Sequence, residues 1–209
     1  MTPASLLRRL RRGRPIVVVS GLPRSGTSMA MKMLEAGGLP IVTDGLRRAD
    51  ASNPNGYYEF ERVKEFDKQG DTAWLADARG KAVKIISFLL TYLPESYDYR
   101  VIFMRRDLGE VVASQNELLD ARGEARGAGD DRTRALYEEH LAQVARFLGQ
   151  RRCFATLTVD YAEAVEEPRA QASRINAFLG GGLDVERMAA VAQPHLYRHR
   201  RQAAISESV

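Results

Sequence analysis

A glycine-containing stretch near the amino terminus has the residue types needed to hold a phosphate or sulfate group. Residues 21–28 read GLPRSGTS and follow the apolar run IVVVS. The glycines allow backbone conformations that point successive N–H groups at an anion, and the following helix adds its positive dipole end. Arg24 supplies a full positive charge, and the hydroxyls of Thr27 and Ser28 can donate further hydrogen bonds. The spacing predicts an anion-binding loop between a strand and a helix, with an ordinary turn carrying a surface arginine as the structural alternative.

The loop lacks the lysine that nucleotide-hydrolysing P-loops carry immediately before their serine or threonine, because position 27 is a threonine. A P-loop kinase uses that lysine together with Mg²⁺ to neutralise a triphosphate. Asp160, at the end of the run LTVD, is the one candidate for holding such a metal. We therefore expect a site without a metal, and an atypical P-loop kinase or nucleotide hydrolase remains an alternative function.

A second segment, RDLGEVVAS at residues 106–114, carries another group suited to phosphate. Arg106 ends a predicted strand, and a guanidinium can bind a phosphate through two parallel hydrogen bonds. Ligands of parallel sheets bind beyond the carboxyl ends of the strands, so Arg106 and the loop can share one crevice. In the alternative interpretation, Arg106 pairs with a nearby carboxylate and Ser114 is an ordinary mid-helix residue.

Together these segments resemble the donor-binding motifs of sulfotransferases that use 3′-phosphoadenosine 5′-phosphosulfate (PAPS). Residues 23–28 match the family's Pro-Lys/Arg-Ser-Gly-Thr-Ser/Thr loop at every position, and an arginine followed by a serine eight residues later matches its second signature. Leu108 departs from the commoner proline, and the resemblance extends more loosely over residues 16–201. The resemblance implies that PAPS is the co-substrate and that two groups of residues bind it. These are Pro23, Arg24, Ser25, Gly26, Thr27 and Ser28 at the 5′-phosphosulfate, and Arg106 and Ser114 at the 3′-phosphate.

Sulfuryl transfer is an in-line displacement at sulfur, so the protein must place cations where negative charge develops. Arg24 fits the leaving-group side. The resemblance suggests Lys84, in KAVKIIS, as a second cation at the transferring group, whereas a lysine at a strand edge is the structural alternative. Many relatives carry a histidine base just after that lysine, but residues 85–87 are Ile-Ile-Ser.

A carboxylate is therefore the expected base, provided that an apolar pocket raises its pKa towards neutrality. Asp44 in IVTDG and Glu59 in GYYE are the two candidates, and Glu61 is a lesser one. Asp44 could instead be a turn residue, and Glu59 a first-turn helix acid. His140 lies in a predicted helix of mixed polarity, so we expect it to be structural. The missing histidine leaves a third hypothesis, a non-catalytic nucleotide-binding module.

The carboxyl-terminal segment QPHLYRHRR is a further candidate for donor binding. Arg198 and Arg200 could replace the Gly-rich, lysine-containing loop with which many relatives cover the 3′-phosphate. A solvated basic tail is the alternative. Aromatic residues of the middle region could line an acceptor pocket, although such residues more often belong to the core. They are Tyr57, Tyr58, Phe60 and Trp74.

Composition limits the partners. The net charge is +4, and five arginines at positions 8, 9, 11, 12 and 14 account for it, because the rest of the 209 residues then carries −1. This distribution argues against a nucleic-acid-binding face. Since no apolar run approaches the ~18 residues of a bilayer span, we expect no membrane span. A single cysteine, Cys153, fits a reducing, cytoplasmic compartment. The expected acceptor is a small molecule or carbohydrate, and a homo-oligomer is compatible with the sequence.

The elements that must position these groups alternate along the chain. Unbroken apolar runs predict strands at residues 16–20, 81–87, 99–106 and 153–160, with a short extended piece at 41–43. Helical patterns cover 27–36, 59–69, an apolar piece that ends at Pro94, 133–148, the segment after Pro168 and 183–192. Another helix is expected after Asp107, which is a candidate cap with Glu110 at capping-box spacing. Residues 120–131 read as a lid or a disordered loop. This order predicts a three-layer α/β fold of the P-loop nucleotide-binding type, with a mainly parallel sheet and helices on both faces. We expect one domain, residues 15–194, between a basic arm, 1–14, and a basic tail, 195–209.

Overall fold

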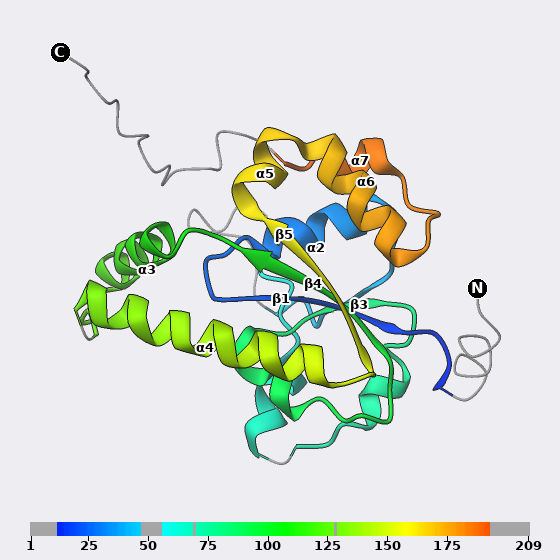
Figure 1. Cartoon of the computed structure of the whole chain (residues 1–209), viewed down its shortest axis with the longest axis horizontal. Helices are drawn as coiled ribbons and strands as arrows, with labels where there is room; N and C mark the ends of the chain where they lie inside the picture. Colours follow the sequence, from blue (N-terminus) through cyan, green and yellow to red (C-terminus); the bar gives the residue numbers. More distant parts are fainter. Residues whose placement is uncertain (1–11, 47–55, 69, 128, 193–209) are drawn as a thin grey trace.

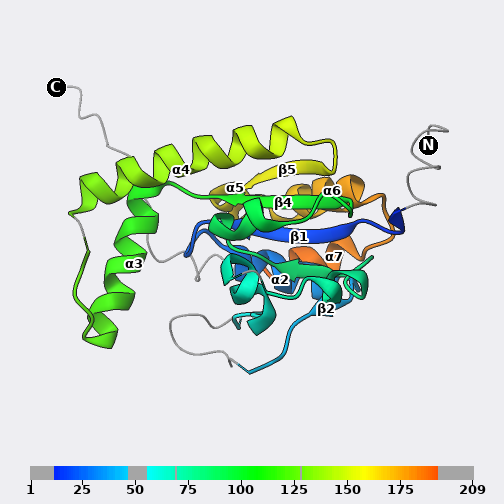
Figure 2. The same cartoon turned by 90° about the horizontal axis from the view of Figure 1, so that it is seen from below.

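The computed structural model describes residues 12–46, 56–68, 70–127 and 129–192. Within these residues a five-stranded sheet has the order β2-β3-β1-β4-β5, and every neighbouring pair is parallel. Figures 1 and 2 show β1 at the centre of the molecule. The strands are β1 (Ile16–Gly21), β2 (Ile41–Val42), β3 (Ala82–Lys84), β4 (Tyr99–Arg105) and β5 (Phe154–Asp160).

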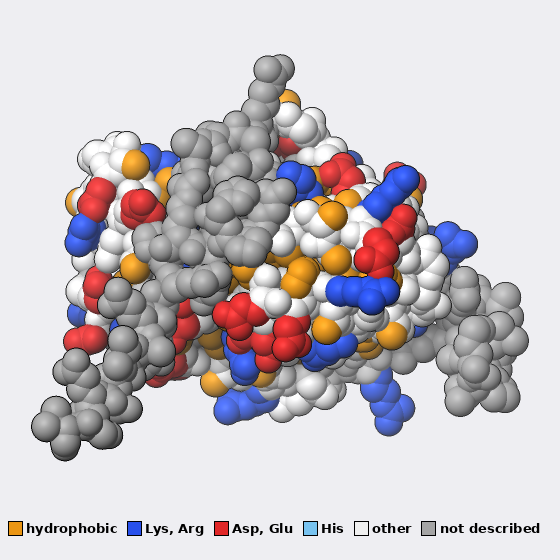
Figure 3. All heavy atoms as spheres, turned by 90° about the horizontal axis from the view of Figure 1, so that it is seen from above, with side chains coloured by type: hydrophobic (Ala, Val, Ile, Leu, Met, Phe, Trp, Pro, Cys, Tyr) orange, Lys and Arg blue, Asp and Glu red, His pale blue; other side chains and the backbone are white. Residues whose placement is uncertain are grey.

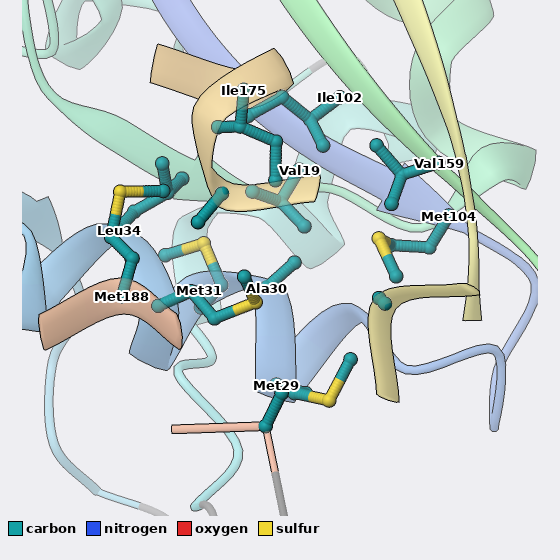
Figure 4. Close-up of a cluster of buried hydrophobic side chains, with 14 of the residues drawn as sticks. Val19, Met29, Ala30, Met31, Leu34, Ile102, Met104, Val159, Ile175 and Met188 are labelled. Carbon is teal, nitrogen blue, oxygen red and sulfur yellow. The ribbon is translucent and has the colours of Figure 1, made fainter. Parts of the chain in front are cut away.

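One face of the sheet is covered by four helices, which lie together in the upper half of Figure 1. They are α2 (Thr27–Ala36), α5 (Tyr161–Glu166), α6 (Pro168–Leu179) and α7 (Val185–Ala189). Val17 and Val19 of β1 point into this layer, because alternate residues of a strand face opposite sides. The core here is rich in methionine, and Met29, Met31, Met104 and Met188 are labelled among its side chains in Figure 4.

The opposite face is covered by α4 (Asp130–Gln150) and three 3₁₀ helices, η1 (Glu61–Lys68), η2 (Ala73–Ala76) and η3 (Ser87–Tyr92). Ile16 and Val18 of β1 point into this second core, which Trp74 and Leu90 also fill. The remaining helix, α3 (Leu108–Arg122), follows β4 and lies beyond the end of the sheet (Figure 2). Helices therefore cover both faces of a parallel sheet, and the predicted fold class is confirmed.

Several predicted element boundaries were wrong. Where helices were predicted at 59–69 and up to Pro94, the structure has the 3₁₀ helices η1 (Glu61–Lys68) and η3 (Ser87–Tyr92). The strand predicted at 81–87 pairs only over Ala82–Lys84 before η3 begins. The predicted loop at 120–131 is shorter, because α3 continues to Arg122 and α4 begins at Asp130. Gly123 ends α3 in the left-handed conformation, φ 67°, as glycine does at many helix ends. The six-residue helix α5 was not predicted from the sequence.

The predicted terminal segments lie largely outside the described residues, including Arg198, Arg200 and the whole tail 195–209. Of the basic arm, Arg12 forms an ion pair with Asp98 at 3.1 Å, just before β4. Among the described residues, no helix combines the length and the apolar character needed to cross a membrane.

Candidate functional site

The predicted anion-binding loop joins β1 to α2, in the order that the sequence indicated. Gly26 is the N-cap of α2 with φ 94°, and Arg24 also has a positive φ of 69°. A Cβ on Gly26 would lie 2.3 Å from the Tyr161 ring, and one on Gly21 would lie 2.6 Å from the Met104 carbonyl oxygen. Glycine is therefore required at both positions for steric reasons, and the loop folds tightly over the carboxyl end of the sheet.

The loop has the features of a phosphate cradle. Gly26, the N-cap of α2, has no side chain with which to cap the helix, and the amides of a helix N-terminus are well suited to bind an anion. Ser25 is buried, and its hydroxyl makes no hydrogen bond to any described residue. Thr27 is also buried, whereas Ser28 is half-buried and Pro23 exposed. The hydroxyls and backbone amides of this loop are donors suited to a phosphate or sulfate group.

Arg24, Arg106 and Ser114 meet at this loop, although up to 90 residues separate them in the chain. The Arg24 Nε donates to the Ser114 hydroxyl at 2.9 Å, and the Arg106 Nη1 donates to the Arg24 carbonyl oxygen at 3.1 Å. Spacing alone left open whether Ser114, two turns into α3, reaches the loop. The structure shows that it does.

Arg106 is also tied to a carboxylate, as the alternative interpretation anticipated. Its Nε donates to Glu110 Oε2 at 2.9 Å, and the two side chains are only 8% and 6% exposed. The Arg106 guanidinium lies over the Tyr161 ring, 4.7 Å from the ring centre. Arg106 therefore contacts both the loop and an acidic neighbour.

Lys84 lies at the carboxyl end of β3, beside Val19 of β1. Its Nζ donates a hydrogen bond to the carbonyl oxygen of Tyr57. The structure thus brings Lys84 against the segment that leads to Glu59. Tyr57 is buried, and Trp74 packs between Phe60 and Phe66 with ring centres 4.9 and 5.6 Å away. Phe60 and Trp74 therefore contribute to the core, as the sequence analysis allowed.

The two candidate carboxylates lie side by side but in different surroundings. Asp44 Oδ2 accepts from the Glu61 amide at 2.7 Å, and Asp44 Oδ1 accepts from the Leu46 amide at 3.0 Å. Partial burial acts to raise the pKa of Asp44, but these backbone hydrogen bonds and the nearby Lys64 charge outweigh it and lower the pKa below its usual value. The expectation of a raised pKa is therefore wrong for Asp44, because amides stabilise its charged form. Glu59, by contrast, forms an ion pair with Lys64 at 3.1 Å.

His140 of α4 lies against η3. Its Nε2 is 2.9 Å from the Ser87 hydroxyl, and its ring stacks on Phe88 with the centres 3.9 Å apart. Burial lowers the pKa of His140. This arrangement joins two elements of the second core.

Asp160 caps α5 by accepting from the Ala162 amide at 3.0 Å, and it pairs with Arg105 at 3.5 Å. It borders a cavity of about 390 Å³ at the carboxyl ends of β4 and β5. In the part of the chain that the structure describes, no three His, Cys, Asp or Glu side chains are grouped to hold a metal ion. The cavity is lined by Arg105, Arg106, Asp107, Leu108, Leu141, Asp160 and Ala162.

The same arrangement of strands and helices occurs in solved structures. Retinol dehydratase in complex with androsterone and the inactive cofactor PAP matches with a TM-score of 0.50 and 18% identity, over 91% of this chain and 68% of that one. The chain shares the retinol dehydratase fold. A second retinol dehydratase structure, with retinol and PAP, gives a TM-score of 0.47 at 17% identity, over 90% and 68% of the two chains.

The sulfotransferase domain from the curacin biosynthetic pathway gives a TM-score of 0.49 at 15% identity, over 84% of this chain and 77% of that domain. No protein-family model matches the chain, and no curated protein sequence matches it. The likeness to retinol dehydratase therefore concerns the fold, and the assignment of roles depends on the site itself.

Sequence reasoning missed two residues of the site, Tyr161 and Glu110. Tyr161 contacts both Gly26 and Arg106, and its signal was only an aromatic residue directly after a strand. Glu110 was interpreted as part of a capping box. Asp107 does accept from the Glu110 amide at 3.1 Å, but the Glu110 carboxylate reaches Arg106. Arg106 precedes α3, whose N-cap is Asp107, so helical spacing did not predict this contact.

Proposed function

We propose that the protein is a PAPS-dependent sulfotransferase, which moves a sulfuryl group to a hydroxyl, or an amine, of a small-molecule or carbohydrate acceptor. The convergence of Arg24, Arg106 and Ser114 at the loop carries this proposal, because it unites the two motifs that distinguish PAPS from other nucleotides. The fold supports it, since a protein of the same fold has been solved with PAP.

On this proposal the loop binds the 5′-phosphosulfate through the amides of residues 23–28 and the side chains of Arg24, Ser25, Thr27 and Ser28. Arg106 and Ser114 bind the 3′-phosphate. No step requires a metal ion, because guanidinium groups and backbone amides supply the positive charge. Arg198 and Arg200 remain candidates for a further contact to the nucleotide.

In the reaction, the acceptor oxygen forms a bond to sulfur while the bond from sulfur to the 5′-phosphate oxygen breaks. The electron pair of that bond leaves with adenosine 3′,5′-bisphosphate (PAP), and the acceptor proton passes to a base. Arg24 stabilises the charge that develops on the leaving oxygen, and Lys84 the charge on the sulfuryl oxygens. Lys84 is suited to this because it lies at the carboxyl end of the sheet, one strand away from the loop.

Glu59 is the better of the two carboxylate candidates for the base. Asp44 already accepts two backbone hydrogen bonds, and its lowered pKa makes it a poor proton acceptor near neutral pH. Glu59 lies two residues from Tyr57, whose carbonyl oxygen binds Lys84. The proposed base and the proposed sulfuryl cation therefore belong to contacting segments.

The acceptor is proposed to be a small molecule and not a nucleic acid. Basic and acidic side chains are interspersed on the face of the molecule shown in Figure 3. Among the described residues visible on that face, basic side chains do not form the extended surface that is typical of nucleic-acid binding.

Isothermal titration calorimetry with PAP, in buffer containing EDTA, tests the proposal. We expect PAP to bind without metal, and more tightly than adenosine 5′-monophosphate (AMP), which has a hydroxyl in place of the 3′-phosphate. Arg106→Ala should weaken PAP binding by about 10- to 100-fold, because hydrogen bonds to charged groups contribute about 1.5–3 kcal/mol, and should affect AMP less.

Arg169→Ala serves as the control, since this exposed arginine lies on α6 and pairs with Glu186. A preference for Mg²⁺-ATP over PAP would favour the kinase hypothesis instead. An equal loss of PAP and AMP affinity in Arg106→Ala would contradict the proposed position of the 3′-phosphate.

A further inference from the structure

The most buried ion pair of the site joins Arg106, which is proposed to bind the 3′-phosphate, to Glu110. Glu110 lies in the first turn of α3, and its carboxylate accepts from Arg106 Nε at 2.9 Å. The side chains of Arg106 and Glu110 are 8% and 6% exposed, so water screens this pair little. Asp107 accepts from the Glu110 amide at 3.1 Å, which fixes the start of the helix and with it the direction of the Glu110 side chain.

The guanidinium of Arg106 is held from three sides. Glu110 binds its Nε, the Arg24 carbonyl oxygen binds its Nη1, and the Tyr161 ring lies beneath its plane. A phosphate that binds this guanidinium must therefore approach within a few ångströms of the Glu110 carboxylate. Like charges at that separation repel each other appreciably in a buried site.

We propose that Glu110 is a built-in counter-anion of Arg106, which lowers the affinity of the site for the 3′-phosphate of the nucleotide. The inference rests on the proposed function, and it adds a residue that sets how tightly the donor and the PAP product are held. A counter-anion has a use here, because PAP retains the 3′-phosphate after transfer. Weaker retention of PAP speeds product release, which limits turnover in many enzymes.

Titration of PAP and of AMP into the wild type and into Glu110→Gln tests the proposal. Glutamine keeps an oxygen that can accept from Arg106 but removes the charge. We expect PAP to bind at least about tenfold more tightly to Glu110→Gln, with AMP affinity changed less than threefold. The dissociation rate of PAP should fall correspondingly, because affinity changes at one site appear mostly in dissociation.

The matched control is Glu95→Gln, which makes the same change in net charge. Glu95 is exposed, pairs with Arg151, and precedes β4, whose other end leads to Arg106. PAP affinity should be unchanged in this control. Glu110→Ala is a second variant that removes the negative charge, so the inference does not depend on one substitution. Loss of a buried ion pair can destabilise a protein, which affects both variants. The ratio of PAP to AMP affinity within one variant also cancels a general loss of folded protein.

A PAP-to-AMP ratio that stays the same or falls in the neutral variants, relative to wild type, would overturn the inference, because Glu110 would then orient Arg106 for the phosphate. A wild type that binds PAP no better than AMP would instead contradict the proposed function. The two failures are therefore distinguishable in one set of titrations.

Discussion

At the scale of single residues, the site is a short chain of polar contacts. Arg106 binds the backbone of Arg24, and Arg24 binds the Ser114 hydroxyl. The positive φ of 69° at Arg24 is uncommon for a residue with a side chain. Such a conformation persists only where the surroundings enforce it, and here it directs the guanidinium towards α3.

Arg24→Ala should lower donor affinity and turnover together, because this side chain is proposed to bind both the ground state and the leaving oxygen. By analogy with the loss of one preorganised donor, we expect turnover to fall by about 10²- to 10³-fold. Single-turnover measurements at saturating PAPS would separate the two effects. Arg24→Lys is the conservative control and should retain part of the activity. A variant that loses affinity alone would remove Arg24 from the chemical step.

At the scale of elements, the site residues lie together at one end of the sheet, where the carboxyl ends of β1, β3 and β4 meet. Parallel pairing places Lys84 beside Val19 and places Met104 beside Gly21. Two further contacts hold neighbouring elements in place. The Tyr58 hydroxyl donates to Glu35 of α2 at 2.6 Å, and the Ser87 hydroxyl and His140 Nε2, 2.9 Å apart, join η3 to α4.

The contact between Ser87 and His140 predicts a dependence of stability on pH. Burial lowers the pKa of folded His140 below the unfolded value of 6.5, so the unfolded state binds the proton more readily. The free energy of unfolding should therefore be steady above pH 6.5 and decrease as the pH falls from there through the folded pKa. Urea unfolding at several pH values measures this decrease.

The matched variant is His140→Gln, which keeps a polar partner for Ser87 but does not titrate. His195 and His199 are present in both proteins, so the difference between the two stability profiles isolates His140. If the wild type and the variant lose stability in parallel below pH 6.5, His140 is not buried as the structure describes.

At the scale of the whole molecule, two hydrophobic cores hold the sheet from opposite faces. The methionine-rich core beneath α2 supports the phosphate loop, and the aromatic core beneath α4 supports the segment around Lys84. Methionine fills irregular spaces well, as between α2 and α7, where Met188 packs against Gly37. Damage to the first core should therefore lower stability and loosen the loop.

Leu34→Ala tests this dependence, because Leu34 is fully buried in α2. The change should lower the free energy of unfolding by about 2–5 kcal/mol, through lost burial and the cavity that remains. Leu136→Ala is the matched control, since Leu136 in α4 is 54% exposed and should alter stability by less than about 0.5 kcal/mol. Chemical denaturation of both variants gives the comparison. Similar losses in both would show that the first core does not depend on α2.

The sequence by itself determined the parallel α/β sheet, the phosphate loop and the strand that leads to Arg106. These features depend on local chemistry: apolar runs form buried strands, glycines allow the turn, and Asp107 caps a helix. It also indicated His140 as a structural residue. Only the tertiary structure decided that Ser114 reaches Arg24, that Asp44 serves as a backbone cap with a lowered pKa, and that Glu110 and Tyr161 border Arg106. Each of these depends on side-chain directions across separate elements, which packing determines and which the spacing of residues along one segment does not encode.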